Sequence, residues 1–451
     1  MTDDDFRDAA DEVFAALLAR IGEQAPQPRL GPSRRLMDLL GDPQRAYPVI
    51  HVTGTNGKTS TSRLIEGLLR AHGLRTGLLT SPHIERFTER ILIDGEPITD
   101  EAVARNWDDI TPYVEMVDAE LAEAGDVPLT YFEALSGLAF AAFADAPVDV
   151  AVIEVGMGGE WDSTNVADGQ VAVFTPIDLD HTSRLGSTVT QIARTKSGII
   201  KPAASVVSAR QSPEAADVLA TASRLSESTL TFEGDGFETT AATVAVGGQL
   251  LSIRGIAGEY AEVFLPLLGA HQAQNAAVAV AAVESFLGSG EHALSREVVE
   301  EAFATTTSPG RMQLVGVEPT VLVDAAHNPH GAHALVEAVR QVFDFDEIAV
   351  VVGVLGDKDA AGILHELDAI ADVMLVTASE SDRAIPAEAL AQLAASVVGQ
   401  KRVASYDRAE DAFEAAHDWA SEAPRRAVVV TGSITLVAEA MAFADDREWK
   451  P

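Results

Sequence analysis

The sequence predicts an α/β protein of two domains, and three observations carry that prediction. From residue 47 onward, short β-branched runs alternate with longer helical patterns, as in a parallel sheet covered by helices. A segment rich in Thr, Ser, Pro and Gly at 305–310 divides this alternation into two series. The length of 451 residues also suggests more than one domain. We therefore expect domains at 1–305 and 306–451.

The first domain is expected to contain a parallel-rich sheet. Residues 49–53 have the composition of a strand. Residues 59–72 predict a helix, because their apolar residues recur at helical spacing and a glycine follows them. The apolar runs 148–155 and 171–177 are typical of strands that are buried on both faces.

Two further regions complete the predicted fold. Gly and Thr alternate with apolar residues over 208–266, which favours a β-rich segment within the first domain. After the dividing segment, a second alternation of strands and helices predicts a smaller Rossmann-like α/β domain of ordinary size. Its expected strands are 321–323, 348–354, 373–377 and 427–431.

The charge balance excludes one class of partner. The chain has 32 Lys and Arg residues against 69 Asp and Glu residues, a formal net charge of −37, so it would repel a phosphate backbone. It has no cysteine, its amino terminus lacks a secretion signal, and its apolar runs are shorter than the ~20 residues of a membrane span. We expect a cytoplasmic monomer that binds neither nucleic acid nor a membrane.

A phosphate-binding loop follows the first predicted strand. Its residues are Gly54, Thr55, Asn56, Gly57, Lys58 and Thr59. Glycines let backbone N–H groups surround phosphate, the following helix adds positive potential, Lys58 can reach the terminal phosphates and Thr59 can help to hold Mg²⁺. The usual pattern has a glycine five residues before Gly57, where this chain has Val52.

This shortened loop resembles that of the Mur ligase superfamily of ATP-dependent amide ligases. More specifically, the chain resembles the folylpolyglutamate synthase and dihydrofolate synthase family. Only 53 residues precede Gly54, too few for the nucleotide-sugar-binding domain of cell-wall Mur ligases. The matching motifs occur in family order at 30–31, 80–83, 129–133, 154–159, 179–181, 196–201, 309–311, 324–329 and 357–359.

The resemblance implies an ATP-dependent ligase that adds L-glutamate to tetrahydrofolate, and to dihydropteroate if both family activities reside here. A carboxylate must be made into a leaving group before an amine can displace it, and phosphorylation by ATP does this through an acyl phosphate. Lys58, Glu154, His181 and Lys196 are the expected catalytic residues. The small-molecule substrates would be ATP, L-glutamate and the folate or dihydropteroate.

The resemblance also implies two Mg²⁺ sites. Thr59 and the family's metal positions, here Ser81, Glu154 and His181, would supply ligands, and hard oxygen donors with an occasional imidazole suit this ion. Taken alone, His181 could instead be a helix-entry residue that hydrogen-bonds to backbone. Lys196 occupies the position of a lysine that the family carboxylates to N6-carboxylysine, which would make it a metal ligand; an isolated lysine would more often be a surface charge.

The remaining candidates bind the substrates. Asn275, Arg311 and Asp324 match the family's ATP contacts, while His327 and Ser433 are candidates for the incoming glutamate; the 324–327 stretch could also be an ordinary capped turn. The expected contacts of the pterin-bearing substrate are Arg29, Leu30, Gly31, Thr130, Tyr131, Phe132, Glu133, Trp161, Asp162 and Ser163. Aromatic rings among them could stack on a heterocycle, although such rings are more often core residues.

Two departures from the family pattern motivate alternatives. Glu160 stands where the family usually has Arg, and Thr195 stands where it usually has Glu. The charge reversal at Glu160 suggests a second hypothesis, a relative that joins an amino acid to a non-folate acid. A third hypothesis is a nucleotide-binding protein without catalysis, which the intact catalytic set argues against.

Overall fold

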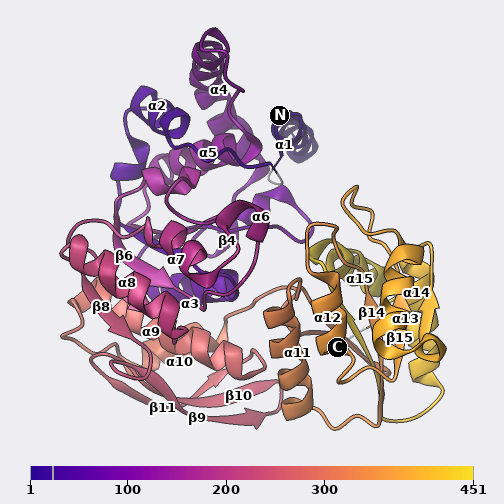
Figure 1. Cartoon of the computed structure of the whole chain (residues 1–451). Coiled ribbons are helices and arrows are strands. Elements are labelled where there is room, and N and C mark those ends of the chain that lie inside the picture. Colours follow the sequence, from indigo (N-terminus) through magenta and orange to yellow (C-terminus); the bar gives the residue numbers. More distant parts are fainter. Residues whose placement is uncertain (1, 23–24, 450–451) are drawn as a thin grey trace. The chain divides into compact units, whose positions relative to one another are not determined.

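The computed structural model describes residues 2–22 and 25–449, which form two compact units (Figure 1). The first comprises Met1–Ala241, Leu251–Phe264 and Gln274–Thr306. The second comprises Ala242–Leu250, Leu265–Ala273 and Thr307–Pro451. The main division between the two units lies between Thr306 and Thr307. The two short segments group with the second unit because they pack there; a Cβ on Gly269, for example, would lie 2.9 Å from the Ala338 Cβ.

The first unit is built on an eight-stranded sheet in the order β4-β3-β2-β5-β1-β6-β7-β8. Strands β2, β5, β1, β6, β7 and β8 are parallel, and β3 and β4 are antiparallel additions at one edge. The strands are β1 (Val49–Thr53), β2 (Thr76–Leu79), β3 (Ile91–Ile93), β4 (Glu96–Pro97), β5 (Val150–Glu154), β6 (Gly169–Phe174), β7 (Ser205–Ser208) and β8 (Thr229–Phe232).

Helices cover this sheet in several groups, and one of them is α3, which packs against β1, β2 and β5 and is itself contacted by α10. Helices α1, α2, α4 and α5 lie together (Figure 1) and share one apolar cluster with β1 and β5. Helices α7 and α8 form a second cluster with β6 and β7. The helices up to residue 306 are α1 (Asp3–Leu18), α2 (Gly31–Leu39), α3 (Lys58–Ala71), α4 (Asp100–Glu123), α5 (Tyr131–Asp145), α6 (Thr182–Leu185), α7 (Val189–Ser197), α8 (Pro213–Leu225), α9 (Ala270–Gly288) and α10 (Arg296–Ala304).

The region expected to be β-rich is only partly so. Strands β9 (Glu238–Ala245), β10 (Gly248–Arg254) and β11 (Glu259–Leu265) form a three-stranded sheet, as expected. Residues 213–225, however, form helix α8, which corrects the expectation for 208–266. Ser212 accepts a hydrogen bond from the Ala215 amide and Pro213 occupies the first turn, so a strong helix start outweighs the surrounding β signals.

The second unit contains a six-stranded sheet in the order β12-β13-β17-β14-β15-β16, parallel except for the edge strand β12. Its strands are β12 (Gln313–Val317), β13 (Thr320–Asp324), β14 (Glu347–Val352), β15 (Val373–Val376), β16 (Val403–Ser405) and β17 (Arg426–Thr431). Two apolar clusters cover it, one with α11 (Pro329–Val342), α12 (Ala360–Leu367) and α13 (Ala387–Val398), the other with α14 (Ala409–Ser421) and α15 (Ile434–Asp446). The predicted second domain is thus a doubly covered α/β sheet.

Among residues 2–22 and 25–449, no helix is both long enough and apolar enough to cross a membrane.

Candidate functional site

The candidate site lies at the carboxyl edge of the first sheet, where ligands bind in open α/β sheets. The central strands β2, β5, β1 and β6 are neighbours and parallel, so the loops after them meet at one edge. These loops carry the expected phosphate loop, Ser81, the glycine-rich 156–159 segment and His181. The order of the strands in the sheet brings these motifs together. Spacing along the chain does not reveal that order.

The phosphate loop has the backbone that its glycines predict. Gly54 has φ 153° and lies so close to Thr175 that a Cβ would overlap the Thr175 hydroxyl. Gly57 has φ 88°, and a Cβ there would lie 2.6 Å from Asn275 Oδ1. Helix α3 begins after Gly57 without a side-chain cap, so its amino terminus presents positive potential to an anion. The loop can hold phosphate, and Asn275 lies directly against it.

Two lysines converge on one carbonyl of this loop. Lys58 Nζ donates to the Gly54 carbonyl at 3.2 Å and to the Thr55 carbonyl at 3.2 Å. Lys196 Nζ donates to the same Gly54 carbonyl at 2.6 Å, and its side chain is buried. Burial, with the nearby positive charge of Lys58, lowers the pKa of Lys196 to about 7. The arrangement favours an anion between the two amines, or a neutral Lys196.

Hydroxyl oxygen atoms lie close to the Glu154 carboxylate at the end of β5. Its Oε1 accepts from the Thr59 hydroxyl at 3.0 Å, and its Oε2 accepts from the Thr80 hydroxyl at 2.5 Å and from the Ser81 amide at 3.4 Å. The carboxylate is fully buried. Burial raises the pKa of Glu154, while Lys58 and these donors oppose the shift. A buried carboxylate surrounded by hydroxyl oxygens is a donor set that fits a hard divalent cation.

His181 lies on the wall of the pocket that contains both lysines. It adopts a left-handed conformation, with φ 49°, at the start of the short helix α6, and its Nε2 is 3.8 Å from Asp180 Oδ2. The pocket is lined by Thr53, Gly54, Thr55, Lys58, Val155, Gly156, Met157, Gly158, Asp180, His181, Leu185 and Lys196.

A ready-made metal cluster is not present within the described residues, where no three His, Asp or Glu side chains gather as potential ligands. The expected metal set explains this, because only Glu154 and His181 belong to those residue types. Thr59 and Ser81 would contribute hydroxyls, and Lys196 could contribute oxygen only after modification. The metal positions remain predictions.

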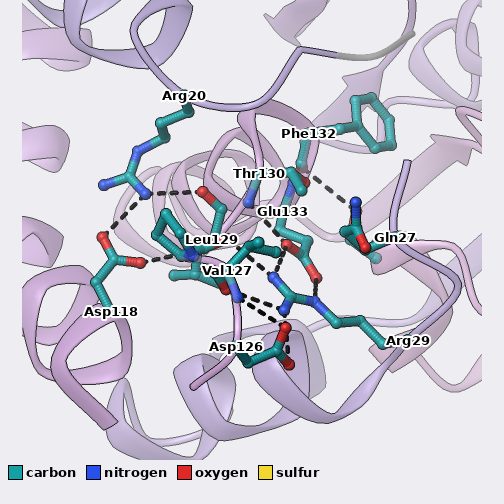
Figure 2. Close-up of polar contacts among 12 residues, drawn as sticks. Arg20, Gln27, Arg29, Asp118, Asp126, Val127, Leu129, Thr130, Phe132 and Glu133 are labelled. Atoms are coloured by element: carbon teal, nitrogen blue, oxygen red, sulfur yellow. Dashed lines mark hydrogen bonds and ion pairs between the residues drawn. The ribbon is translucent and has the colours of Figure 1, made fainter. Parts of the chain in front are cut away.

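The expected folate contacts include a structural clamp (Figure 2). Arg29 Nε and Nη2 donate to Glu133 Oε1 and Oε2 at 3.1 and 3.0 Å, and its Nη1 is 3.0 Å from Asp126 Oδ2. The same guanidinium donates to the carbonyls of Val127 and Pro128 at 3.0 and 2.9 Å. Arg29 therefore ties the segment before α2 to the start of α5, and its donors are already used within the protein.

Glu133 also caps helix α5, in whose first turn it lies. The Thr130 amide donates to Glu133 Oε2 at 2.7 Å, and the Glu133 amide donates to the Thr130 hydroxyl at 3.3 Å, which is a capping box. Tyr131 is buried in the core, with the Arg90 guanidinium 5.3 Å above its ring. Phe132 is only partly buried and lies against Gly156, where a Cβ would be 2.5 Å from the ring. Among these aromatic residues, Phe132 is the better placed to meet a ligand.

The other expected folate contacts differ in their surroundings. Leu30 is partly buried against the α1–α5 cluster, and Gly31 is exposed at the first position of α2. Trp161 packs partly buried against the α7–α8 cluster. The Ser163 hydroxyl lies 2.7 Å from the Ser136 hydroxyl and 3.3 Å from the Phe132 carbonyl. Asp162 is fully buried and accepts the Met157 amide at 2.8 Å, so its carboxylate holds the loop.

The remaining candidates lie in the second unit, around the ends of β13 and β17. Asp324 accepts the Met312 amide through Oδ2 and the Ala326 amide through Oδ1, each at 2.8 Å, and so shapes the backbone beside Arg311. His327 Nδ1 is 2.9 Å from the Ala325 carbonyl. The buried Ser433 hydroxyl caps α15 by accepting the Leu436 amide at 3.2 Å.

Sequence reasoning missed His51 and Thr164. Both are fully buried and contact each other, with His51 Nε2 2.9 Å from the Thr164 hydroxyl oxygen. One signal was available, because a histidine inside an otherwise apolar strand has to find a polar partner.

Two family descriptions match the chain. Residues 52–283 match the Mur ligase middle domain, and residues 310–434 match the Mur ligase glutamate ligase domain. Their boundary agrees with the division between the two units near residue 306.

Individual proteins resemble the chain over nearly its whole length. The dihydrofolate synthase/folylpolyglutamate synthase of Mycobacterium tuberculosis is 42% identical over 457 residues, which cover 95% of this chain and 94% of that protein. Folylpolyglutamate synthase of Lacticaseibacillus casei is 36% identical, covering 91% and 94%. The solved structure of Mycobacterium tuberculosis folylpolyglutamate synthase complexed with ADP matches with a TM-score of 0.93 at 41% identity, covering 97% of this chain and 99% of that one.

Proposed function

The chain belongs to the folylpolyglutamate synthase and dihydrofolate synthase family of the Mur ligase superfamily, and from that premise we propose that it joins L-glutamate to a folate in an ATP-dependent ligation. The observation that carries this proposal is the convergence of Lys58 and Lys196 on the Gly54 carbonyl, at the phosphate loop and beside buried Glu154. The hypothesis of a non-folate acid is not favoured, since the matched relatives are named for folates and the Glu160 side chain is exposed.

The proposed reaction has two steps. A carboxylate oxygen of the folate attacks the γ-phosphorus of ATP, and the bond to the ADP oxygen breaks. The amine of L-glutamate then attacks the acyl carbon, phosphate leaves, and the amine gives up a proton. The protein has to position these groups and balance the charge of the transferring phosphoryl group. Loop amides and Lys58 are suited to that task.

We propose that Mg²⁺ is held by Thr59, Ser81 and Glu154, and at a second site by His181 and a modified Lys196. The oxygen atoms gathered around Glu154 fit such an ion. When bound, Mg²⁺ would neutralise phosphate charge. Lys58 and the α3 amino terminus would complete the positive surroundings of the nucleotide.

The modification proposed for Lys196 is carboxylation of its amine to N6-carboxylysine. The neutral Nζ attacks the carbon of CO₂, one C–O π bond becomes an oxyanion, and the nitrogen loses a proton to solvent. A pKa of about 7 makes a neutral amine available near neutral pH. The product is an anion beside Lys58. An attraction between opposite charges thereby replaces the repulsion between two positively charged amines. Carbon-13 NMR in ¹³C-bicarbonate should give a carbamate signal that Lys196→Ala abolishes; a signal that persists in the variant would refute this assignment.

The other substrate contacts stay proposals of the same kind. Asn275, Arg311 and Asp324 are proposed to contact ATP, and His327 and Ser433 to contact the incoming glutamate. Phe132, which lies against the pocket loop at Gly156, supports placing the pterin-bearing substrate nearby. The Mycobacterium tuberculosis relative is named for both activities, which favours a second activity on dihydropteroate. We also propose that the protein acts as a cytoplasmic monomer on small molecules only.

The decisive assay combines purified protein with ATP, Mg²⁺, L-glutamate and tetrahydrofolate. We expect ADP, phosphate and a product heavier by one glutamyl unit. Lys58→Ala should abolish all three, whereas Lys401→Ala, at an exposed lysine, should not. Formation of ADP without the heavier product would overturn the folate assignment. Dihydropteroate in place of tetrahydrofolate tests the second activity in the same format.

A further inference from the structure

We propose that His51, Thr164 and Asp162 form a buried hydrogen-bond relay that holds the 156–159 loop in the shape required for nucleotide binding. His51 and Thr164 are then positioning residues for the ligase. The inference rests on the proposed function for its catalytic meaning, but nucleotide binding alone can test it.

Thr164 is the middle member of the relay. Its hydroxyl oxygen is 2.5 Å from Asp162 Oδ1 and 2.9 Å from His51 Nε2. A hydroxyl has one proton to donate and can accept in return. An ionised carboxylate can only accept, so the Thr164 proton points to Asp162. The Thr164 oxygen must then accept from His51, which places the ring proton on Nε2.

The donors around Asp162 support its ionised form. Besides the Thr164 hydroxyl, the Thr164 amide donates to Oδ1 at 3.0 Å and the Met157 amide donates to Oδ2 at 2.8 Å. The Gly156 amide also interacts with the carboxylate. Burial raises the pKa of Asp162, and these hydrogen bonds oppose that effect. The three backbone amides can only donate, so each of them favours the ionised carboxylate over the protonated one.

His51 is held neutral by its position in the sheet. Its register partners in the neighbouring strands, Ile153 and Ala172, belong to the two apolar clusters on the same face, so the ring lies between them. Burial, with a smaller contribution from Lys201, lowers the pKa of His51 to about 3. Within the described part of the chain, Nδ1 has no hydrogen-bond partner, so Thr164 is the ring's polar contact.

The loop that Asp162 holds is part of the pocket wall. Gly156, Met157 and Gly158 line the pocket with Lys58 and Lys196. Thr53 anchors the loop from β1, since its hydroxyl donates to the Gly158 carbonyl at 2.8 Å. At Gly159 the loop lies against helix α7, where a Cβ would be 2.7 Å from the Lys196 carbonyl oxygen. A shift of Asp162 would therefore displace the surface facing both lysines.

The test compares Thr164→Val with Thr164→Ser. Valine has nearly the shape of threonine but no hydroxyl, while serine keeps the hydroxyl and loses only a methyl group. Isothermal titration with ADP should give a dissociation constant about tenfold higher for Thr164→Val and within about twofold of the parent for Thr164→Ser. In turnover assays, kcat/KM for ATP should fall in Thr164→Val while KM for L-glutamate stays constant.

Thr76→Val is the matched control. Thr76 is also fully buried and donates to a buried carboxylate, Glu66 Oε1, at 2.6 Å, but it lies outside the pocket lining. Thermal unfolding should reveal comparable destabilisation of the two valine variants, with weakened ADP binding only in Thr164→Val. Equal ADP affinities in the two valine variants, or an equal loss in Thr164→Ser and Thr164→Val, would overturn the proposal.

A spectroscopic measurement tests the proton assignment independently. Two-bond ¹H–¹⁵N spectra distinguish the two neutral tautomers of histidine, and His51→Leu identifies the signal. The relay requires a neutral ring with the proton on Nε2; a proton on Nδ1 would refute it. If the wild-type protein binds ADP but glutamylates no folate, the proposed function fails while the Thr164 comparison still decides the relay.

Discussion

The Arg29 clamp makes a quantitative prediction, because this ion pair is bidentate and largely buried. Only 15% of the Arg29 side chain and 6% of the Glu133 side chain are exposed. The perturbation is Arg29→Met, which keeps much of the apolar stem and removes every guanidinium donor. Glu133 would then retain its capping bonds with Thr130 but lose both charge-assisted bonds from Arg29.

The expected loss of unfolding free energy follows from that geometry. Removing one partner of a buried ion pair costs about 3–5 kcal/mol. The other acidic partner, Asp126, has a side chain that is 49% exposed, so solvent weakens its contribution. We therefore expect a loss of unfolding free energy at the lower end of that range, about 3 kcal/mol. The midpoint of thermal unfolding should fall by roughly 3–5 °C. Glu133→Gln should cost less, since glutamine can still accept in a capping box.

A double-mutant cycle isolates the pair. Chemical denaturation of Arg29→Met, Glu133→Gln and the double variant should give a coupling energy of about 1–3 kcal/mol. The pair of Arg35 and Glu120 is the control, because it has similar bidentate contacts but is exposed, and its coupling should be much smaller. Because the clamp ties together two segments expected to contact the folate, KM for tetrahydrofolate should also rise in Arg29→Met, with ADP affinity unchanged.

Two outcomes would refute this reasoning. An unfolding midpoint in Arg29→Met equal to that of the parent would mean that the pair adds no stability. A coupling energy as small as that of the exposed control would mean that burial does not strengthen the interaction.

Three further predictions concern the pocket. Lys196→Ala should lose most ligase activity and regain part of it with short-chain carboxylates; full activity without them would contradict a modified Lys196. Because carboxylation needs the neutral amine, which predominates above a pKa of about 7, reactivation of CO₂-depleted enzyme by CO₂ should be faster at pH 8 than at pH 6 at equal dissolved CO₂. Gly54→Ala should raise the ADP dissociation constant at least tenfold, because its Cβ would overlap Thr175, whereas Gly125→Ala, with open space around its Cβ, should not.

The strongly acidic composition agrees with the positions of its few lysines. Among the six lysines, Lys58, Lys196 and Lys201 direct their amines to backbone carbonyls, the last to Asn165 at 2.9 Å. A negative exterior repels anionic substrates, so cations at the pocket have to offset that field locally. The net charge of −37 therefore describes the whole chain and not the pocket.

Much of the fold was predictable because buried parallel strands have a strong composition signal. The strand predicted at 49–53 is β1 without change, and those predicted for the second unit agree with the structure to within a few residues. Helix α8 was missed because the signals at its start, Ser212 and Pro213, lie in a region whose overall composition favours strands. Capping interactions at the start of this segment favoured a helix over a strand.

The sequence by itself indicated which residues to expect at the pocket. Gly54, Gly57 and Lys58 could be identified because phosphate binding requires particular backbone angles and a cation within a short stretch of chain. Glu154, His181 and Lys196 could be identified only through family resemblance, since each is far from the others in sequence.

Only the tertiary structure decided what the polar side chains around the pocket contact. Arg29, Glu133 and Asp162 were expected at the substrate, yet their hydrogen bonds are directed into the protein. Asp162 holds the loop of the pocket, and the other two hold the segment before α2 and the start of α5. His51 and Thr164 meet across 113 positions of sequence. Buried polar groups need partners, and the partner of a given residue depends on which strands and loops become neighbours. Residue spacing along the chain does not show which strands and loops become neighbours.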